Sequence, residues 1–291
     1  MKSIAVVGSI NIDTTVYMDK FPKKGETRIG DFSSTSLGGK GCNQAIAISN
    51  AKGNVCFYGS VGDDDKANIA KNYINSFGLN AELHVCGKAE TGSATILVES
   101  TGENRIVVLK GANEFVNKDT LPNSVFNKDI IVLQNEIPSE TISLLTNAYK
   151  DRIVVFNPAP TKEIDESVFG NITYLILNEG ELAFYGKNKG EPIDYLLSLG
   201  VKNIIVTLGK RGSTLYSKCG TTHVDASKAV AIDTVAAGDT YIGYFTAMIA
   251  EGKNNKEAME IASLASGIAV TRRGAAISIP KLEEVIKWKK K

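Results

Sequence analysis

The sequence predicts an α/β protein in which helices cover both faces of a mostly parallel sheet. Short runs rich in β-branched residues alternate with segments of helical periodicity through most of the 291 residues. The strand-like runs are continuously apolar, which is typical of parallel strands that are buried on both faces. This alternation of buried strands and helices is the pattern of βαβ units.

The expected elements follow from these runs. The strand candidates are residues 4–7, 54–58, 130–133, 153–156, 174–177 and 203–206. The helix candidates are residues 43–50, 64–77, 139–149, 193–199, 240–250, 254–270 and 281–289. The helix at 240–250 carries apolar residues at helical spacing on two faces, so we expect it to be buried.

Two segments, residues 14–37 and 93–110, interrupt the alternation. The first has two strand-like arms around residues 21–26, and the second pairs its arms across residues 101–104. Four extra strands would form a small sheet beside the main one. Such a sheet is either a lid that excludes water from a reacting phosphate or an ordinary antiparallel extension. With no other boundary in the chain, we expect residues 1–291 to form one domain.

Composition excludes several classes of function. Lys and Arg total 33 against 32 Asp and Glu, so no global field attracts nucleic acid. Two histidines argue against histidine-based catalysis or a zinc site, and four cysteines without a Cys-x-x-Cys pair suit reduced intracellular thiols. No apolar stretch approaches the ~20 residues of a membrane span. We expect a cytoplasmic protein with no membrane or nucleic-acid partner.

The segment 233–239, Asp-Thr-Val-Ala-Ala-Gly-Asp, carries the most specific chemical signal. Ala236, Ala237 and Gly238 leave the first-turn N–H groups of the following helix unobstructed. With the helix dipole, these groups form an anion site. Asp239 beside this site is placed to take a proton from an attacking hydroxyl, as phosphoryl transfer requires. The alternative is that Asp239 caps the helix and the small residues permit a tight turn.

A glycine-rich segment, residues 37–45, leads into the first expected helix. Gly39 allows the backbone to approach a ligand, and Lys40 and Asn43 offer donors that suit a polyhydroxylated sugar. The segment is not a Walker A loop, because Gly41 follows the lysine where Ser or Thr is required. The alternative is a plain glycine-rich turn into a helix.

Polar residues also follow two expected strands. Asn11 and Asp13 come after residues 4–7, and Glu136 comes after residues 130–133. Open α/β sheets bind ligands at the carboxyl ends of their strands. Each residue alone could be a turn residue or a cap, but as a set they resemble a sugar pocket.

Two more strand ends are candidates for a nucleotide site. Asn178 and Glu181 follow residues 174–177, and their oxygens suit hydrated Mg²⁺ near phosphates, although an Asn-Glu pair also begins many helices. Residues 207–212 follow residues 203–206. They form either a nucleotide-facing loop or a plain hairpin turn.

Five motifs, in order along the chain, resemble the ribokinase family of sugar kinases, also called the PfkB family. They lie at residues 8–13, 38–45, 157–160, 233–239 and 269–275, and the likeness covers essentially the full length. The resemblance implies a three-layer αβα sandwich with a mostly parallel sheet and a small β-sheet lid that often mediates homodimers. It also implies ATP-dependent phosphorylation of a sugar CH₂OH group.

The resemblance implies roles for individual residues. Asp239 would be the general base, and the amides of Ala236, Ala237 and Gly238 would hold charge on the transferring phosphoryl group. The residues implied in sugar binding are Asn11, Asp13, Gly39, Lys40, Asn43, Glu136 and Asp239. Those implied beside ATP and Mg²⁺ are Asn178, Glu181, Thr207, Leu208, Gly209, Lys210, Arg211, Gly212 and Gly238. Those implied around a monovalent cation, K⁺, are Asp233, Val235, Ala269, Arg272, Gly274 and Ser278.

The resemblance implies D-ribose as the substrate, and Glu136 favours a free sugar with an exposed anomeric side. A kinase of another furanose, such as a nucleoside or a ketose, is the alternative within the same class. A non-catalytic sugar-binding regulator is the alternative from another class, and the intact Asp239, Gly238 and Lys40 argue against it.

Overall fold

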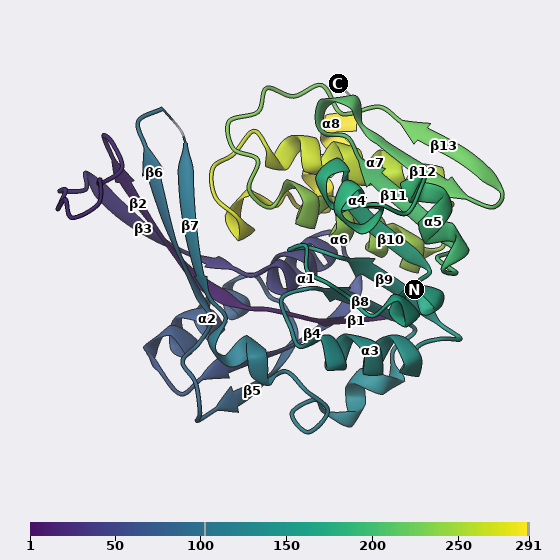
Figure 1. Cartoon of the computed structure of the whole chain (residues 1–291), viewed down its shortest axis with the longest axis horizontal. Helices are drawn as coiled ribbons and strands as arrows, with labels where there is room; N and C mark the ends of the chain where they lie inside the picture. Colours follow the sequence, from purple (N-terminus) through teal and green to yellow (C-terminus); the bar gives the residue numbers. More distant parts are fainter. Residues whose placement is uncertain (102, 290–291) are drawn as a thin grey trace.

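The computed structural model describes residues 1–101 and 103–289, and its strands form two sheets (Figure 1). Within these residues the larger sheet has nine strands in the order β13-β12-β11-β10-β9-β8-β1-β4-β5. These strands are β1 (Ser3–Val7), β4 (Asn54–Gly62), β5 (Ala81–Cys86), β8 (Ile130–Gln134), β9 (Ile153–Asn157), β10 (Tyr174–Asn178), β11 (Asn203–Thr207), β12 (Ser213–Ser217) and β13 (Gly220–Val224). From β11 to β5 all neighbours are parallel, whereas β12 and β13 extend the sheet as an antiparallel edge.

Helices cover both faces of this sheet. The helices are α1 (Lys40–Asn50), α2 (Asp65–Ser76), α3 (Ser139–Ala148), α4 (Glu179–Tyr185), α5 (Pro192–Ser198), α6 (Ala237–Glu251), α7 (Asn255–Ala269) and α8 (Leu282–Lys289). Ile4 and Val6 of β1 belong to one core cluster with residues of α1, α2, α6, α7 and α8, whereas Ala5 and Val7 belong to another with residues of α3 and α5. This alternation confirms the predicted αβα sandwich, because successive residues of a strand face opposite sides.

The helix predicted to be buried is α6. Every residue from Thr240 to Ala250 is buried. The helix packs closely on α1 because Gly243 has no side chain, and a Cβ there would lie 2.3 Å from the Cβ of Ala47. This contact brings the first turn of α6 beside the first turn of α1.

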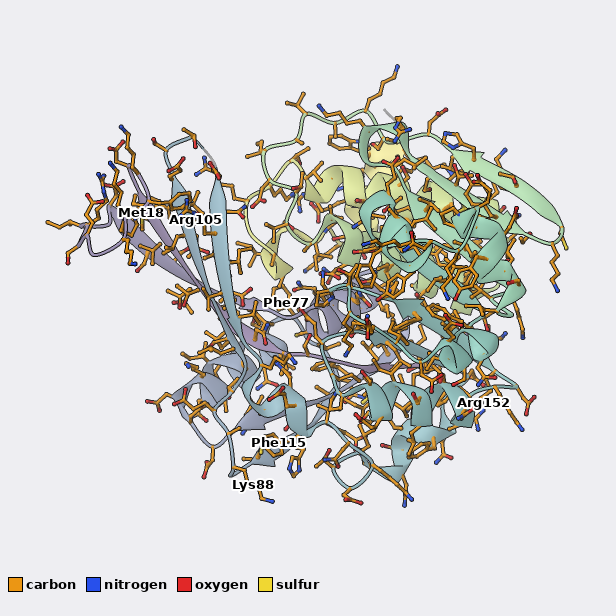
Figure 2. The ribbon with its side chains drawn as sticks, in the orientation of Figure 1. Met18, Phe77, Lys88, Arg105, Phe115 and Arg152 are labelled. Atoms are coloured by element: carbon orange, nitrogen blue, oxygen red, sulfur yellow. The ribbon has the colours of Figure 1, made fainter. Side chains whose placement is uncertain are left out.

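The predicted small sheet is present and projects from the body of the molecule (Figure 1). It consists of β2 (Asn11–Met18), β3 (Phe32–Gly38), β6 (Ser93–Glu99) and β7 (Asn104–Leu109), in the order β3-β2-β6-β7. Met18 and Arg105 lie on its projecting part, where the Arg105 guanidinium stacks 4.3 Å above the ring of Phe21 (Figure 2). Residue 102, in the predicted turn 101–104, lies outside the described residues.

Several elements differ from those expected. The edge strands β5 and β13, the strand β12 next to β13, and the short helix α4 were not predicted, because their burial is partial and their apolar runs are short. Helix α1 begins at Lys40, three residues before the predicted start. None of the helices in residues 1–101 and 103–289 has the length and apolar character needed to span a membrane.

Candidate active site

The residues that follow β1 lie against the glycine-rich start of α1. Gly39 precedes the helix with φ 89°, and a Cβ there would lie 2.8 Å from the carbonyl oxygen of Ser9. The N–H of Cys42 donates to this same carbonyl at 2.9 Å. Only glycine combines this left-handed conformation with so close an approach, which explains the glycines of the motif.

Glu136 joins these two segments to the end of β8. Its Oε2 accepts a hydrogen bond from the backbone N–H of Lys40 at 2.9 Å and another from the hydroxyl of Ser9. The structure therefore brings together Lys40 and Glu136, which are 96 residues apart in the chain.

Asp13 lies on β2 with its carboxylate over the Cα of Gly38. A Cβ on Gly38 would lie 1.9 Å from Oδ2 of Asp13, so any larger residue there would displace this carboxylate. Oδ1 of Asp13 and Oδ1 of Asn43 are both buried without a hydrogen-bond partner among the described residues. Burial, followed by the nearby charge of Glu136, raises the pKa of Asp13 to about 7. Buried acceptors without partners are what a ligand rich in hydroxyl groups would satisfy.

The raised pKa gives a testable pH dependence of stability. Unfolded Asp13 ionises near its ordinary pKa of 3.8, whereas folded Asp13 ionises near 7. The folded state therefore loses stability from this group as the pH rises from about 4 to 7. Asn does not titrate, so the Asp13→Asn variant lacks this pH-dependent loss. We expect the free energy of unfolding of the variant, minus that of wild type, to be about 2–3 kcal/mol larger at pH 8 than at pH 5. Urea unfolding of the ligand-free proteins measures this, and an equal effect at both pH values would contradict it.

Asn113, which the sequence analysis did not identify, holds Asn11 at the start of β2 in place. Its Nδ2 donates to Oδ1 of Asn11 at 2.8 Å and to the carbonyl of Ile10 at 3.1 Å, and its Oδ1 accepts from the N–H of Ile10 at 3.0 Å. Asn113 lies in a 3₁₀ turn after β7 and belongs to no motif. Because Oδ1 of Asn11 is engaged, the amide nitrogen of Asn11 remains to donate to a ligand.

Asp239 lies in the first turn of α6 and is only 8% exposed. Its Oδ1 accepts from Nε2 of Gln44 at 2.9 Å and its Oδ2 from Nδ2 of Asn43 at 3.2 Å. The N-cap of the helix is Ala236, in the left-handed region at φ 57°. The interpretation of Asp239 as a mere cap is therefore wrong, because its carboxylate faces α1.

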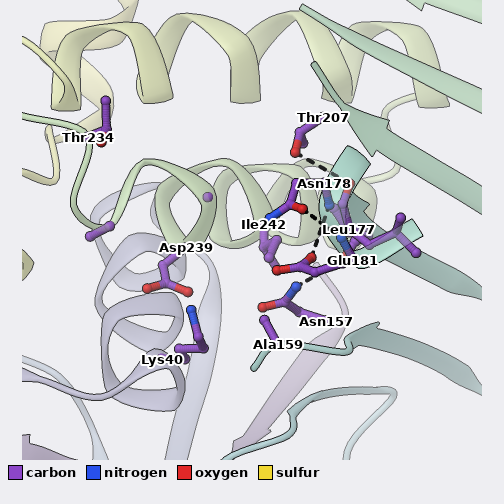
Figure 3. Close-up of a pocket in the computed structure, with 13 residues that line it drawn as sticks. Lys40, Asn157, Ala159, Leu177, Asn178, Glu181, Thr207, Thr234, Asp239 and Ile242 are labelled. Carbon is purple, nitrogen blue, oxygen red and sulfur yellow. Dashed lines mark hydrogen bonds between the residues drawn. The ribbon is translucent and has the colours of Figure 1, made fainter. Parts of the chain in front are cut away.

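The backbone N–H groups of residues 236–238 lie at the start of α6, in its first turn and N-cap. The first i−4 hydrogen bond of the turn runs from the N–H of Thr240 to the carbonyl of Ala236 at 2.8 Å, and the N–H of Ala237 donates to the carbonyl of Thr234 at 3.3 Å. Opposite this turn, the side chain of Lys40 points toward Asp239 (Figure 3). The carboxylates of Asp239, Glu136 and Glu181 raise the pKa of Lys40, although burial opposes them, so Lys40 is cationic at neutral pH.

A cavity of about 210 Å³, here called the central cavity, opens between α6 and the carboxyl ends of β10 and β11 (Figure 3). It is lined by Lys40, Asn157, Ala159, Ile176, Leu177, Asn178, Glu181, Thr207, Thr234, Ala236, Gly238, Asp239 and Ile242. Of the predicted nucleotide residues, Asn178 and Glu181 form a capping box at the start of α4, with hydrogen bonds of 2.9 and 3.0 Å. The two residues therefore cap a helix and also line the cavity.

A second cavity of about 280 Å³, here called the apolar cavity, shares Thr207, Thr234 and Gly238 with the central one. Most of its lining residues are small, among them Ser263, Ser266 and Gly267 of α7. These three are spaced three and four residues apart on one helical face, a signal that the sequence analysis did not use.

The predicted loop 207–212 divides between two environments. Thr207, Gly209, Lys210 and Gly212 line the apolar cavity. Leu208 packs against the core on the α3 side, and Arg211 forms an ion pair with Glu179. The loop also closes a hairpin from β11 to β12, so it is both a turn and a cavity wall.

The residues predicted around a cation lie where the segment after α7 meets the segment before α6. Oδ1 of Asp233 accepts from the N–H of Val235 at 3.0 Å and Oδ2 from the N–H of Gly274 at 2.9 Å. Arg272 instead pairs with Glu284, and the hydroxyl of Ser278 donates to the carbonyl of Ala275 at 2.8 Å. The carbonyl of Ala269 accepts from the N–H of Arg272 at 3.0 Å. Asp233 therefore fixes the turn that leads to Ala236.

Comparison with known proteins decides the family. A family model described as pfkB family carbohydrate kinase matches residues 1–282. The chain belongs to this family.

The relatives of this chain are named as kinases of more than one sugar. A ribokinase of Schizosaccharomyces pombe is 37% identical over 98% of this chain and 97% of its own length. A deoxyribokinase of Salmonella typhi is 32% identical over 97% of this chain and 96% of its own length. The structure of Arabidopsis thaliana ribokinase complexed with ribose and ATP superimposes with a TM-score of 0.92 at 28% identity, covering 100% of this chain and 99% of that chain. This PfkB carbohydrate kinase thus combines the family's fold with a buried carboxylate, a facing lysine and a helix N-terminus around one cavity.

Proposed function

We propose that this PfkB carbohydrate kinase transfers the γ-phosphoryl group of ATP to the O5 hydroxyl of D-ribose. The observation that carries the proposal is the position of Asp239. This buried carboxylate lies between the polar residues around Glu136 and Asp13 on one side and the central cavity at the start of α6 on the other. A hydroxyl held against Asp239 would face a phosphate held in that cavity.

In the proposed reaction, Asp239 accepts the proton of the sugar hydroxyl as its oxygen forms a bond to the γ-phosphorus. The bond between the γ-phosphorus and the bridging oxygen breaks, and ADP leaves with the electron pair. The N–H groups of Ala236 and Gly238 and the ammonium of Lys40 stabilise negative charge on the transferring group, which is the main catalytic demand in phosphoryl transfer. The N–H of Ala237, which donates to the carbonyl of Thr234, would join them only by giving up that bond.

The two cavities suit the two ends of ATP. The small side chains of the apolar cavity leave room for a flat base, and its junction with the central cavity at Gly238 leads the phosphates to the start of α6. Glu181 would hold hydrated Mg²⁺, which needs only one or two carboxylates beside phosphate oxygens and water. Because Oε2 of Glu181 already accepts a hydrogen bond in the capping box, Oε1 is the oxygen that would face the ion. When bound, Mg²⁺ would neutralise phosphate charge.

The turn at Asp233 suits a monovalent cation that sets the conformation of residues 233–238. The carboxylate already holds Val235 and Gly274 together, and each of its oxygens has a second lone pair for a cation. Backbone carbonyls of the two segments would complete an oxygen cage of the kind that hard cations prefer.

Activity should therefore depend on K⁺. With saturating Mg-ATP and ribose at constant ionic strength, we expect initial rates to fall when KCl is replaced by choline chloride, because the Ala236–Gly238 amides lose their orientation. Asp233→Ala should lose both the K⁺ response and most activity. Equal rates in K⁺-free and K⁺-containing buffer would contradict the cation site.

A second copy of the chain is the proposed partner of the small sheet. Four consecutive apolar residues of β7 are exposed, with Val107 at 64% and Leu109 at 62%. Exposed apolar patches of this kind mark interaction surfaces. In a homodimer formed through this sheet, each copy would cover exposed apolar side chains of β7 of the other while the sheet closes over the sugar.

Removal of the hairpin tests this arrangement. Replacing residues 93–110 with a short Gly-Ser turn should shift the protein from dimer to monomer and raise the KM for sugar more than the KM for ATP. Light scattering and steady-state kinetics measure the two effects. Unchanged mass and kinetics would show that the sheet is neither a lid nor an interface.

Substrate identity is tested by ADP release over ribose, 2-deoxyribose, ketohexoses and nucleosides. The proposal expects the highest kcat/KM with ribose. A higher value with a nucleoside or ketose would favour the alternative kinase, and no turnover with any of them would favour a sugar-binding regulator.

A further inference from the structure

A chain of buried side-chain amides holds the carboxylate of Asp239 from behind. Gln44 and Gln134 are fully buried, at 0% exposure, and belong to α1 and β8. Nε2 of Gln44 donates to Oδ1 of Asp239 at 2.9 Å, and Oε1 of Gln44 accepts from Nε2 of Gln134 at 2.7 Å. Neither glutamine lines the central cavity.

The orientation of the Gln44 amide follows from its neighbours. The NH₂ group is the donor end of the Gln44 amide, and it is this end that faces the acceptor oxygen Oδ1 of Asp239. The carbonyl oxygen of Gln44 then faces β8, where Gln134 supplies the matching donor. Nε2 of Gln44 also donates to Oδ1 of Asn157, with 3.5 Å between the two atoms. Nδ2 of Asn157 in turn donates to the carbonyl oxygen of Ile176 at 2.9 Å.

The backbone is shaped to admit this chain. A Cβ on Gly8 would lie 2.1 Å from Oε1 of Gln134, so the amide of Gln134 occupies the space that a side chain at position 8 would fill. The close packing of Gly243 on Ala47 brings α1 near enough to α6 for Gln44 to reach Asp239. Two glycines therefore make room for the same row of amides.

We propose that Gln44 is a positioning residue for Asp239 and that Gln134 fixes the orientation of the Gln44 amide. This inference rests on the proposed role of Asp239 as the general base. With one amide donor on each oxygen, Asp239 is held in one rotamer, and its remaining lone pairs are directed toward the sugar hydroxyl. A misplacement of about 1 Å at a reacting group can lower a rate about 100-fold.

Two substitutions of Gln44 separate positioning from simple packing. Gln44→Met keeps the volume but loses the donor, so we expect kcat to fall at least about 10-fold while both KM values stay within about two-fold of wild type. Gln44→Glu places a second carboxylate against Asp239, and one proton is then shared between them until the pH is high. In this variant the acidic limb of the plot of kcat against pH should therefore shift to higher pH by at least about one unit. A merely structural role would lower kcat equally at every pH.

Gln134→Met should reproduce the loss of kcat more weakly, because Gln44 keeps its donor but loses its fixed orientation. Thr246→Val is the matched control, since it removes a buried hydrogen bond elsewhere on α6, from the Thr246 hydroxyl to the carbonyl of Ile242 at 2.8 Å. It should leave kcat and the pH profile unchanged. Circular dichroism and unfolding midpoints show whether each variant folds. If Gln44→Met does not fold, the results for Gln44→Glu and Gln134→Met test the positioning role instead.

Asp239→Asn, measured in parallel, distinguishes the two proposals. If Asp239→Asn is inactive while Gln44→Met keeps kcat within about two-fold of wild type, the positioning role is overturned and the base survives. The same holds if Gln44→Glu keeps the wild-type acid limb. If Asp239→Asn is itself active, the proposed function fails, and the positioning role fails with it.

Discussion

Asp239→Asn should lower kcat by ~10²–10⁴-fold while leaving the binding of sugar and ATP nearly intact. The amide preserves the shape of the side chain but does not accept the hydroxyl proton. The change corresponds to about 3–5 kcal/mol of additional barrier. Steady-state kinetics give kcat, and calorimetric titration gives the two dissociation constants.

Asp65→Asn is the control for this substitution. Asp65 lies in the first turn of α2, as Asp239 lies in the first turn of α6, but it is exposed and lines neither the central nor the apolar cavity. It should retain wild-type kcat. A variant with Asn at position 239 that keeps more than half of wild-type kcat would remove Asp239 from the mechanism.

Glu136→Ala and Asn43→Ala should each raise the KM for sugar about 5–150-fold, with little change in the KM for ATP. Each substitution removes hydrogen bonds to a sugar hydroxyl and leaves buried partners unpaired, which costs ~1–3 kcal/mol. Glu136 additionally holds the N–H of Lys40 and the hydroxyl of Ser9, so its loss should have the larger effect.

Glu140→Ala, four residues farther along the chain and exposed on α3, is the matched control and should leave both KM values unchanged. Equal increases in the KM values for sugar and ATP in the Glu136 or Asn43 variants would indicate a distorted protein or a misplaced sugar pocket.

The sequence predicted the parts of the molecule whose signal is local. Continuously apolar runs identified the central parallel strands, and the small-residue turn before Asp239 identified the start of α6. The edge strands β5 and β13 and the neighbouring strand β12 were missed because each is partly exposed and its apolar run is short.

The residues missed at the site depend on contacts across long stretches of chain. Asn113 reaches Asn11 over 102 residues, and Gln44 reaches Asp239 over 195. An asparagine or a glutamine has no local signature of such a role, because its partners are set by the strand order and by the packing of α1 on α6. The walls of the apolar cavity were missed for the same reason, since small residues on a helix are ordinary until another element faces them.

The most direct test of the account is to identify the product that the protein forms from ribose and ATP. Phosphorus NMR of the reaction mixture should show ribose 5-phosphate and ADP in equal amounts with the wild-type protein, and neither above background with Asp239→Asn at matched concentration. Phosphate on another hydroxyl, or the same product formed at the wild-type rate by Asp239→Asn, would contradict the proposed transfer at Asp239.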